Sequence, residues 1–111
     1  MFYIKKRLII SSAHCLDLNY DSKCTAIHGH NWEVIIYCKA KELDENGMVI
    51  DFTVIKEKVM VFDHTFLNNM FESGFNPTAE NMARYFVNSI PFCYKATVIE
   101  SENNEATYER D

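Results

Sequence analysis

The 111-residue sequence predicts one small α+β domain, in which two helices cover one face of an antiparallel sheet. Three observations predict it: two long segments of alternating apolar and polar residues, two segments with apolar residues at helical spacing, and two short alternating segments. Neither an internal repeat nor a linker-like stretch divides residues 1–111. The predicted order of elements is therefore β, β, α, α, β, β.

The first predicted strand covers residues 2–14, where a period of two puts the apolar side chains on one face, with His14 at the strand's end. An irregular polar loop follows at 15–27. Alternation resumes at His28, and both His28 and His30 share a face with the apolar residues of that second strand. If the two strands pair, the three imidazoles meet at one rim of the sheet.

A turn is predicted at 44–47, and Asp51 can then cap a helix over about 52–62. Thr78 is predicted as the N-cap of a second helix, which Pro91 stops. The predicted buried positions are Phe52, Ile55, Val59 and Phe62 in the first helix, and Ala79, Met82, Ala83, Phe86 and Ile90 in the second.

Residues 94–100 and 104–109 predict two short strands joined by a turn. Four strands leave two open edges, and small sheets usually cover or pair such edges. We therefore expect the chain to associate with copies of itself through a sheet edge.

The composition excludes several classes of protein. A net charge of −5 argues against nucleic acid or an acidic membrane as the main partner. The apolar runs are far shorter than the ~20 residues that cross a bilayer, and the N-terminus does not resemble a signal peptide. None of the four cysteines falls in a C-x-x-C pair, which favours reduced thiols and a cytoplasmic location.

The strongest local signal is His28-Gly29-His30, which projects two imidazoles from one face of a strand. With His14 they predict a zinc site, because three neutral histidines leave a fourth position for water or substrate, as in catalytic sites. An H-x-H pair is only moderately specific, and each histidine can also be an ordinary polar residue near a strand end.

Four further residues carry candidate chemistry. Cys24, after Lys23, can lose its proton near a cation and a metal and act as a base or nucleophile. In Asp63-His64 the carboxylate can orient the imidazole for proton transfer. Glu100 is either a solvated strand end or a group that accepts two parallel N–H bonds from a pterin or guanine edge. A mixed zinc site using Cys15 and Cys24 is a weaker alternative.

Together these residues resemble the 6-pyruvoyltetrahydropterin synthase family, and most closely its queuosine-pathway branch of 6-carboxytetrahydropterin synthases. The matching stretches occur in the family's order over residues 12–100. They are Ser12-Ala13-His14, Cys24-x-x-x-His28-Gly29-His30-Asn31, Gly47-Met48-Val49-Ile50-Asp51-Phe52, Asp63-His64-x-x-Leu67-Asn68, Asn76-Pro77-Thr78-x-Glu80-Asn81 and Glu100. One departure is Ser101, where a threonine usually follows the acid.

The resemblance implies a T-fold and a role for each residue. It implies zinc ligands at His14, His28 and His30, a catalytic base at Cys24, a proton relay at Asp63-His64, a pterin-anchoring catalytic acid at Glu100, and substrate contacts at Lys23 and Thr78. It further implies a homohexamer built from two trimers, with its sites between subunits. Lys5, Lys6, Arg7 and Lys23 are candidates for a basic patch that attracts a polyanionic substrate.

The implied reaction is cleavage of 7,8-dihydroneopterin triphosphate to 6-carboxy-5,6,7,8-tetrahydropterin, acetaldehyde and triphosphate. Three alternatives remain open at this point: formation of 6-pyruvoyltetrahydropterin without cleavage, a cyclohydrolase acting on GTP, and a non-catalytic metal-binding assembly module.

Overall fold

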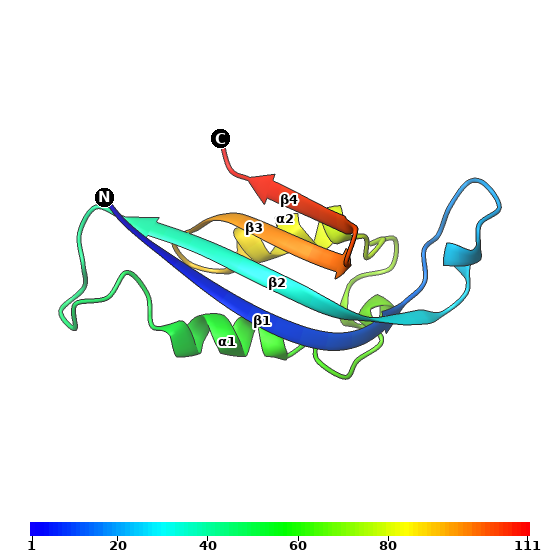
Figure 1. The fold of residues 1–111 in the computed structure, drawn as a ribbon, viewed down its shortest axis with the longest axis horizontal. Helices are drawn as coiled ribbons and strands as arrows, with labels where there is room; N and C mark the ends of the chain where they lie inside the picture. Colours follow the sequence, from blue (N-terminus) through cyan, green and yellow to red (C-terminus); the bar gives the residue numbers. More distant parts are fainter.

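The computed structural model describes residues 1–111 and confirms the predicted class and order of elements. One four-stranded antiparallel sheet has the strand order β1-β2-β3-β4. The elements are β1 (Phe2–His14), β2 (His28–Ala40), α1 (Phe52–Met60), α2 (Ala79–Ser89), β3 (Cys93–Ser101) and β4 (Asn104–Glu109), with short 3₁₀ helices η1 (Lys23–Thr25) and η2 (Leu67–Met70). The long β1–β2 hairpin extends beyond β3 and β4, toward the loop that carries η1 (Figure 1).

The β1–β2 hairpin keeps one register over its whole length, from Phe2 opposite Ala40 to His14 opposite His28. His30 lies opposite Ser12 in the same ladder. Paired residues of an antiparallel sheet point to the same face. The register therefore brings the three histidine-bearing positions together at the end of the hairpin where the 15–27 loop joins the two strands, as the alternation predicts.

Both helices begin at the predicted caps. The Asp51 carboxylate accepts a hydrogen bond from the backbone N–H two residues further on (2.8 Å). The Thr78 hydroxyl accepts one from the N–H three residues on (3.1 Å). Each side chain satisfies a donor that the first helical turn leaves unpaired.

One predicted core position is wrong. Phe52 is 49% exposed, because the first residue of α1 lies beside the 43–51 loop and lines an open apolar cavity with Phe2 and Met48. Helix α1 also ends at Met60, yet Phe62 beyond it is buried as predicted. The other predicted helix positions lie in a single core between the helices and the sheet.

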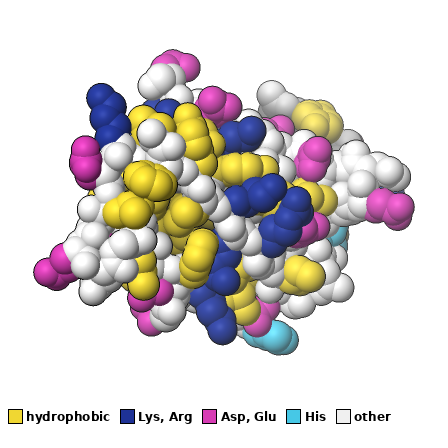
Figure 2. Space-filling model, turned by 60° about the vertical axis from the view of Figure 1, so that its left-hand side comes forward, with side chains coloured by type: hydrophobic (Ala, Val, Ile, Leu, Met, Phe, Trp, Pro, Cys, Tyr) yellow, Lys and Arg dark blue, Asp and Glu magenta, His cyan; other side chains and the backbone are white.

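The four cations proposed as a basic patch do not gather. Lys5 and Arg7 alternate with the buried face of β1, and Arg7 forms an ion pair with Glu33 (2.8 Å). Lys6 points toward the helices, with its ammonium 5.8 Å from the ring of Phe52. Lys23 lies in the loop at the other end of the hairpin. On the side of the molecule drawn in Figure 2, basic side chains run through a region of exposed hydrophobic ones.

Neither helix has the length and apolar character that a membrane-spanning helix needs.

Candidate metal centre

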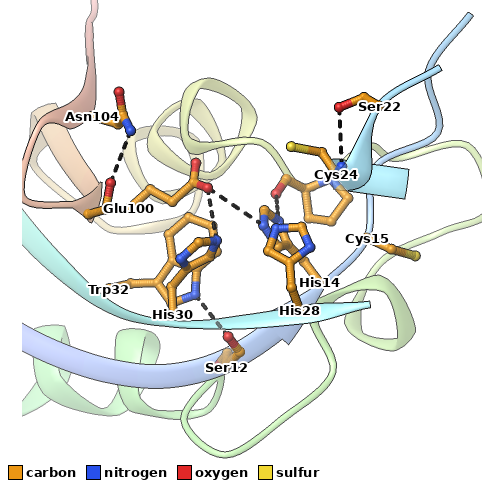
Figure 3. Close-up of polar contacts among 12 residues, drawn as sticks. Ser12, His14, Cys15, Ser22, Cys24, His28, His30, Trp32, Glu100 and Asn104 are labelled. Carbon is orange, nitrogen blue, oxygen red and sulfur yellow. Dashed lines mark hydrogen bonds and ion pairs between the residues drawn. The ribbon is translucent and has the colours of Figure 1, made fainter. Parts of the chain in front are cut away.

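Three histidines and one glutamate converge where the β1–β2 hairpin passes the end of β3. The nearest ligand atoms of His14, His28, His30 and Glu100 all lie within 4.8 Å of one another. Figure 3 shows the three imidazoles side by side, with the Glu100 carboxylate directed at them. His14 is fully buried, and the other three are partly buried.

The outer nitrogens of two of these imidazoles are fixed by backbone carbonyls. His14 Nδ1 lies 2.8 Å from the Pro77 carbonyl oxygen, and His28 Nδ1 lies 2.8 Å from that of Ala26. Since a carbonyl can only accept, each Nδ1 carries a proton and donates it. In the neutral ring Nε2 then offers its lone pair toward the centre of the cluster, which is the arrangement of a histidine prepared to bind a metal.

The inner nitrogens have no hydrogen-bond partner. His14 Nε2 and His30 Nε2 are both buried and unpaired. Glu100 Oε1 approaches them to 3.9 Å and 2.9 Å, but even the shorter approach lacks the alignment of a hydrogen bond. Lone pairs that face a carboxylate in a buried place are unfavourable unless a cation lies among them. The residues therefore fit a bound divalent cation.

Burial keeps these imidazoles in the state that a metal needs. Removal from water lowers the pKa of His14, an effect that the Pro77 carbonyl and Glu100 oppose. The pKa of His30 is lowered for the same main reason and is likewise opposed by Glu100. Neutral imidazole is the form that coordinates metals. Trp32 supports both rings, 4.8 Å and 5.1 Å from their centroids, and donates its Nε1–H to the Ser12 carbonyl (3.1 Å).

Cys24 lies beside the cluster in the loop between β1 and β2. Its backbone N–H donates to the Ser22 hydroxyl (3.1 Å), which caps η1, and its carbonyl accepts from the Leu16 N–H (2.9 Å). The structure thus fixes the backbone of Cys24 from both sides. A cavity of about 490 Å³ joins this residue to the metal cluster. Its lining residues are Lys23, Cys24, His28, His30, Glu100, Ser101 and Asn104.

Two asparagines that sequence reasoning did not single out hold this loop. The Asn68 side chain accepts from the Cys15 N–H (3.0 Å) and donates to the Cys15 carbonyl (2.9 Å), as a neighbouring strand would. Asn76 makes the same pair of bonds with the backbone of Asp17 (3.1 and 3.3 Å). Asn68 ends one of the stretches that resemble the family, and Asn76 begins another. These positions were the sign in the sequence that the two asparagines matter.

Asp63 and His64 form the predicted pair, but away from this cavity. His64 Nδ1 lies 2.8 Å from Asp63 Oδ2, while Asp63 Oδ1 accepts from the Ser11 N–H (2.7 Å). Chiefly through that N–H, the pKa of Asp63 is lowered. His64 has a left-handed backbone (φ 57°) and a side chain that is 81% exposed. Neither residue lines the cavity that holds Cys24.

Thr78 and Cys15 also lie outside the cavity lining. Thr78 caps α2 and follows Pro77, whose carbonyl binds His14, so its place next to the centre is set by the backbone. The Cys15 sulfur points away from the imidazoles (Figure 3), and the metal-competent group contains no cysteine. All four cysteines are free thiols, so nothing in the structure favours a mixed cysteine and histidine site.

Comparisons with known proteins agree with this architecture. Residues 3–111 match the sequence model of the 6-pyruvoyl tetrahydropterin synthase family. A curated Pyrococcus horikoshii protein, named putative 6-carboxy-5,6,7,8-tetrahydropterin synthase, is 45% identical over 69 residues, which are 58% of this chain and 43% of that protein. The chain thus matches less than half the length of that relative. The 6-carboxy-5,6,7,8-tetrahydropterin synthase of Bacillus subtilis is 28% identical over 123 residues, covering 96% of this chain and 84% of that protein.

A solved structure gives the same assignment. The structure of Caenorhabditis elegans 6-pyruvoyl tetrahydropterin synthase superimposes with a TM-score of 0.77 at 27% identity, covering 99% of this chain and 96% of that one. The family model and the fold agree over nearly the whole chain, and we conclude that it belongs to the 6-pyruvoyl tetrahydropterin synthase family.

Proposed function

We propose that the chain is a zinc-dependent lyase of queuosine biosynthesis in the cytoplasm. It converts 7,8-dihydroneopterin triphosphate and a water molecule to 6-carboxy-5,6,7,8-tetrahydropterin, acetaldehyde and triphosphate. One observation carries the proposal: unpaired imidazole nitrogens, a thiol-bearing residue and a carboxylate meet at one cavity. The names of the curated relatives support this branch of the family.

His14, His28 and His30 would hold the Zn²⁺ ion. Neutral imidazoles are ligands that zinc prefers, and two of these three are already oriented by backbone carbonyls. When bound, zinc supplies Lewis acidity, which lowers the pKa of substrate hydroxyls.

Cys24 and Glu100 act on opposite parts of the substrate. The Cys24 thiolate removes a carbon-bound proton from the substrate's side chain, and the hydrogen bonds on either side of this residue limit its movement. The Glu100 carboxylate accepts two parallel N–H bonds from the pterin ring and so positions the reacting carbon against the base. Lys23, in the same cavity, and Thr78, at the start of α2, supply further contacts to substrate.

Asp63 and His64 serve the cavity of a neighbouring subunit. The pair is preformed, since the Asp63 carboxylate orients the imidazole, but it faces solvent in the single chain. Strand β4 and the part of β1 before Ser11 are open edges, through which sheets of several copies can continue; residues 63–66 pair with the end of β1. We therefore propose a homohexamer of two trimers, in which His64 of one chain moves protons at the substrate hydroxyls bound by another.

A second reaction has its own support. The solved structure with a TM-score of 0.77 is a 6-pyruvoyl tetrahydropterin synthase, and formation of a pyruvoyl product uses the same groups without cleaving the side chain. The two reactions differ in whether a carbon–carbon bond breaks, so the products separate them.

The decisive experiment incubates the zinc-loaded protein with 7,8-dihydroneopterin triphosphate and measures acetaldehyde, triphosphate and the pterin product. We expect acetaldehyde and 6-carboxytetrahydropterin in equal amounts. Triphosphate release with a pyruvoyl product and no acetaldehyde assigns the second reaction. Formate released from GTP assigns a cyclohydrolase instead. Bound zinc with no turnover of either compound leaves a metal-binding assembly module and overturns the proposal.

A further inference from the structure

Glu100 makes the candidate metal centre a group of four residues rather than three. Its Oε1 atom lies 2.9 Å from His30 Nε2 and 3.9 Å from His14 Nε2. Alternation puts Glu100 on the same face of β3 as the buried Val98. Glu100 is also the extra residue of a bulge, since Ile99 pairs with Glu105 and Ser101 with Asn104. Bulges redirect a side chain locally.

Four protein ligands and catalysis make conflicting demands. A zinc ion held by four protein side chains is closed to substrate, whereas catalytic zinc sites keep one position open. Glu100 also cannot easily serve as a ligand and as the pterin anchor at once, since two parallel N–H bonds occupy both carboxylate oxygens.

We propose that Glu100 exchanges between two positions. Without substrate it is the fourth ligand of the metal, and when the pterin ring binds it leaves the metal to grip the ring. The second position rests on the proposed function, but the first does not. The exchange opens the metal only when a pterin is already in place, which couples ring recognition to activation of the centre.

The surroundings of Glu100 permit this movement and favour the metal-facing position in the absence of substrate. The side chain is 28% exposed, and neither a backbone N–H nor a side-chain hydrogen bond holds its carboxylate. The turn behind it is held separately, because Asn104 donates to the Ser101 hydroxyl (3.0 Å). On its other side Glu100 shares a cavity with Glu80 and Glu105. These negative charges repel the carboxylate toward the cation, and N–H donors from a ligand can draw it away.

The first arm of the test uses Co²⁺ alone, whose visible spectrum reports the number and kind of ligands. We expect Glu100→Gln to bind Co²⁺ about 10–100-fold more weakly than the unmodified protein, with an altered spectrum. Glu105→Gln is the matched control: Glu105 is a neighbouring carboxylate outside the metal group, so its loss should weaken Co²⁺ binding far less than the loss of Glu100 and leave the spectrum unchanged. Unchanged affinity and spectrum in Glu100→Gln would overturn the proposed fourth ligand.

Thermal unfolding of the same variants shows that a loss of affinity is not a loss of fold. In the metal-free protein the Glu100 carboxylate faces unpaired nitrogens, whereas the amide of glutamine can donate to them. Metal-free Glu100→Gln should therefore unfold at a temperature at least as high as that of the metal-free unmodified chain. With Co²⁺ bound, the unmodified chain should unfold at the higher temperature. If metal-free Glu100→Gln unfolded at a lower temperature than the unmodified chain, the Glu100 carboxylate would not face unpaired nitrogens.

The second arm adds unsubstituted pterin, which has the ring but no side-chain hydroxyls. Because ring and metal compete for Glu100, Co²⁺-loaded protein should bind this pterin several-fold more weakly than metal-free protein, and pterin should weaken Co²⁺ binding by the same factor. Equal affinities and an unchanged Co²⁺ spectrum overturn the exchange. Pterin that binds neither form refutes both the exchange and the proposed function, while the result of the first arm stands.

Discussion

The buried histidine cluster and the exposed Asp63-His64 pair are built in opposite ways. In the cluster only the outer nitrogens of His14 and His28 are hydrogen-bonded, and the inner nitrogens of His14 and His30 lack a donor. In the pair, both Asp63 oxygens are occupied, one by a backbone N–H and one by His64. The cluster therefore needs a cation to be complete, whereas the pair is complete as a local structure and lies outside the cavity that holds Cys24.

Burial accounts for the electrostatic difference between the two regions. Loss of water lowers the pKa of His14 and His30, which favours the neutral, metal-binding form. At the surface, hydrogen bonds to the carboxylate lower the pKa of Asp63 and keep it charged beside an imidazole. The first region is prepared to bind a metal, and we propose that the second holds and passes a proton.

The largest expected effect is a loss of zinc affinity that follows from changing the histidine cluster but not from changing the Asp63-His64 pair. His14→Ala should weaken zinc binding on the order of 10³-fold, because each proposed histidine ligand carries a large share of a typical zinc-binding free energy of ~10–16 kcal/mol. Turnover should fall to background. His64→Ala should leave zinc affinity unchanged, and competition with a chromogenic chelator measures both. Equal losses of zinc affinity in His14→Ala and His64→Ala would show that the two regions do not differ in metal binding.

Cys24→Ala should lower turnover by ~10²–10⁴-fold, the usual range for loss of a general base, while zinc content stays at one ion per chain. Cys15→Ala is the control, because the sulfur of Cys15 points away from the cavity. Steady-state rates and metal analysis on the same preparations test both. Intact turnover in Cys24→Ala would show that another group removes the proton.

Mixing two inactive variants tests whether the surface pair completes a neighbour's cavity. Cys24→Ala and His64→Ala chains, unfolded and refolded together, should recover up to about a quarter of wild-type turnover, since random assembly leaves roughly one site in four with both groups intact. Each variant refolded alone sets the baseline. If both groups act within one chain, the mixture stays at that baseline.

The sequence predicts the cluster more fully than it predicts the pair's surroundings. Strand alternation alone puts His14, His28 and His30 on one face, and the uninterrupted register of the hairpin then brings them together. Side-chain caps such as Asp51 and Thr78 are equally local, because the bond spans only two or three residues. Features that depend on short spacing were therefore predictable.

Features that depend on distant backbone were not predictable from spacing. The Pro77 carbonyl that orients His14 lies 63 residues away in the chain. Alternation puts Glu100 on the same face as Val98, but its approach to His30 depends on the register between β2 and β3, which spacing does not reveal. The exposure of Phe52 likewise follows from where α1 lies relative to the sheet, although helical spacing alone placed it in the core.

The smallest expected effect concerns the acid stability of the surface pair. A carboxyl whose pKa is lowered by folding stabilises the folded state above its unfolded pKa of about 3.9, and that contribution is lost as pH falls through the lower folded value. Asp63→Asn should therefore lower the urea midpoint at pH 7, and the difference from the unmodified chain should narrow toward pH 3. Val61→Ala, an exposed change nearby, should give a difference that does not vary with pH. If the difference in urea midpoint between Asp63→Asn and the unmodified chain stayed constant with pH, packing of this side chain rather than its charge would hold it against the Ser11 N–H. The pair would then lack the charged carboxylate that proton transfer by His64 requires.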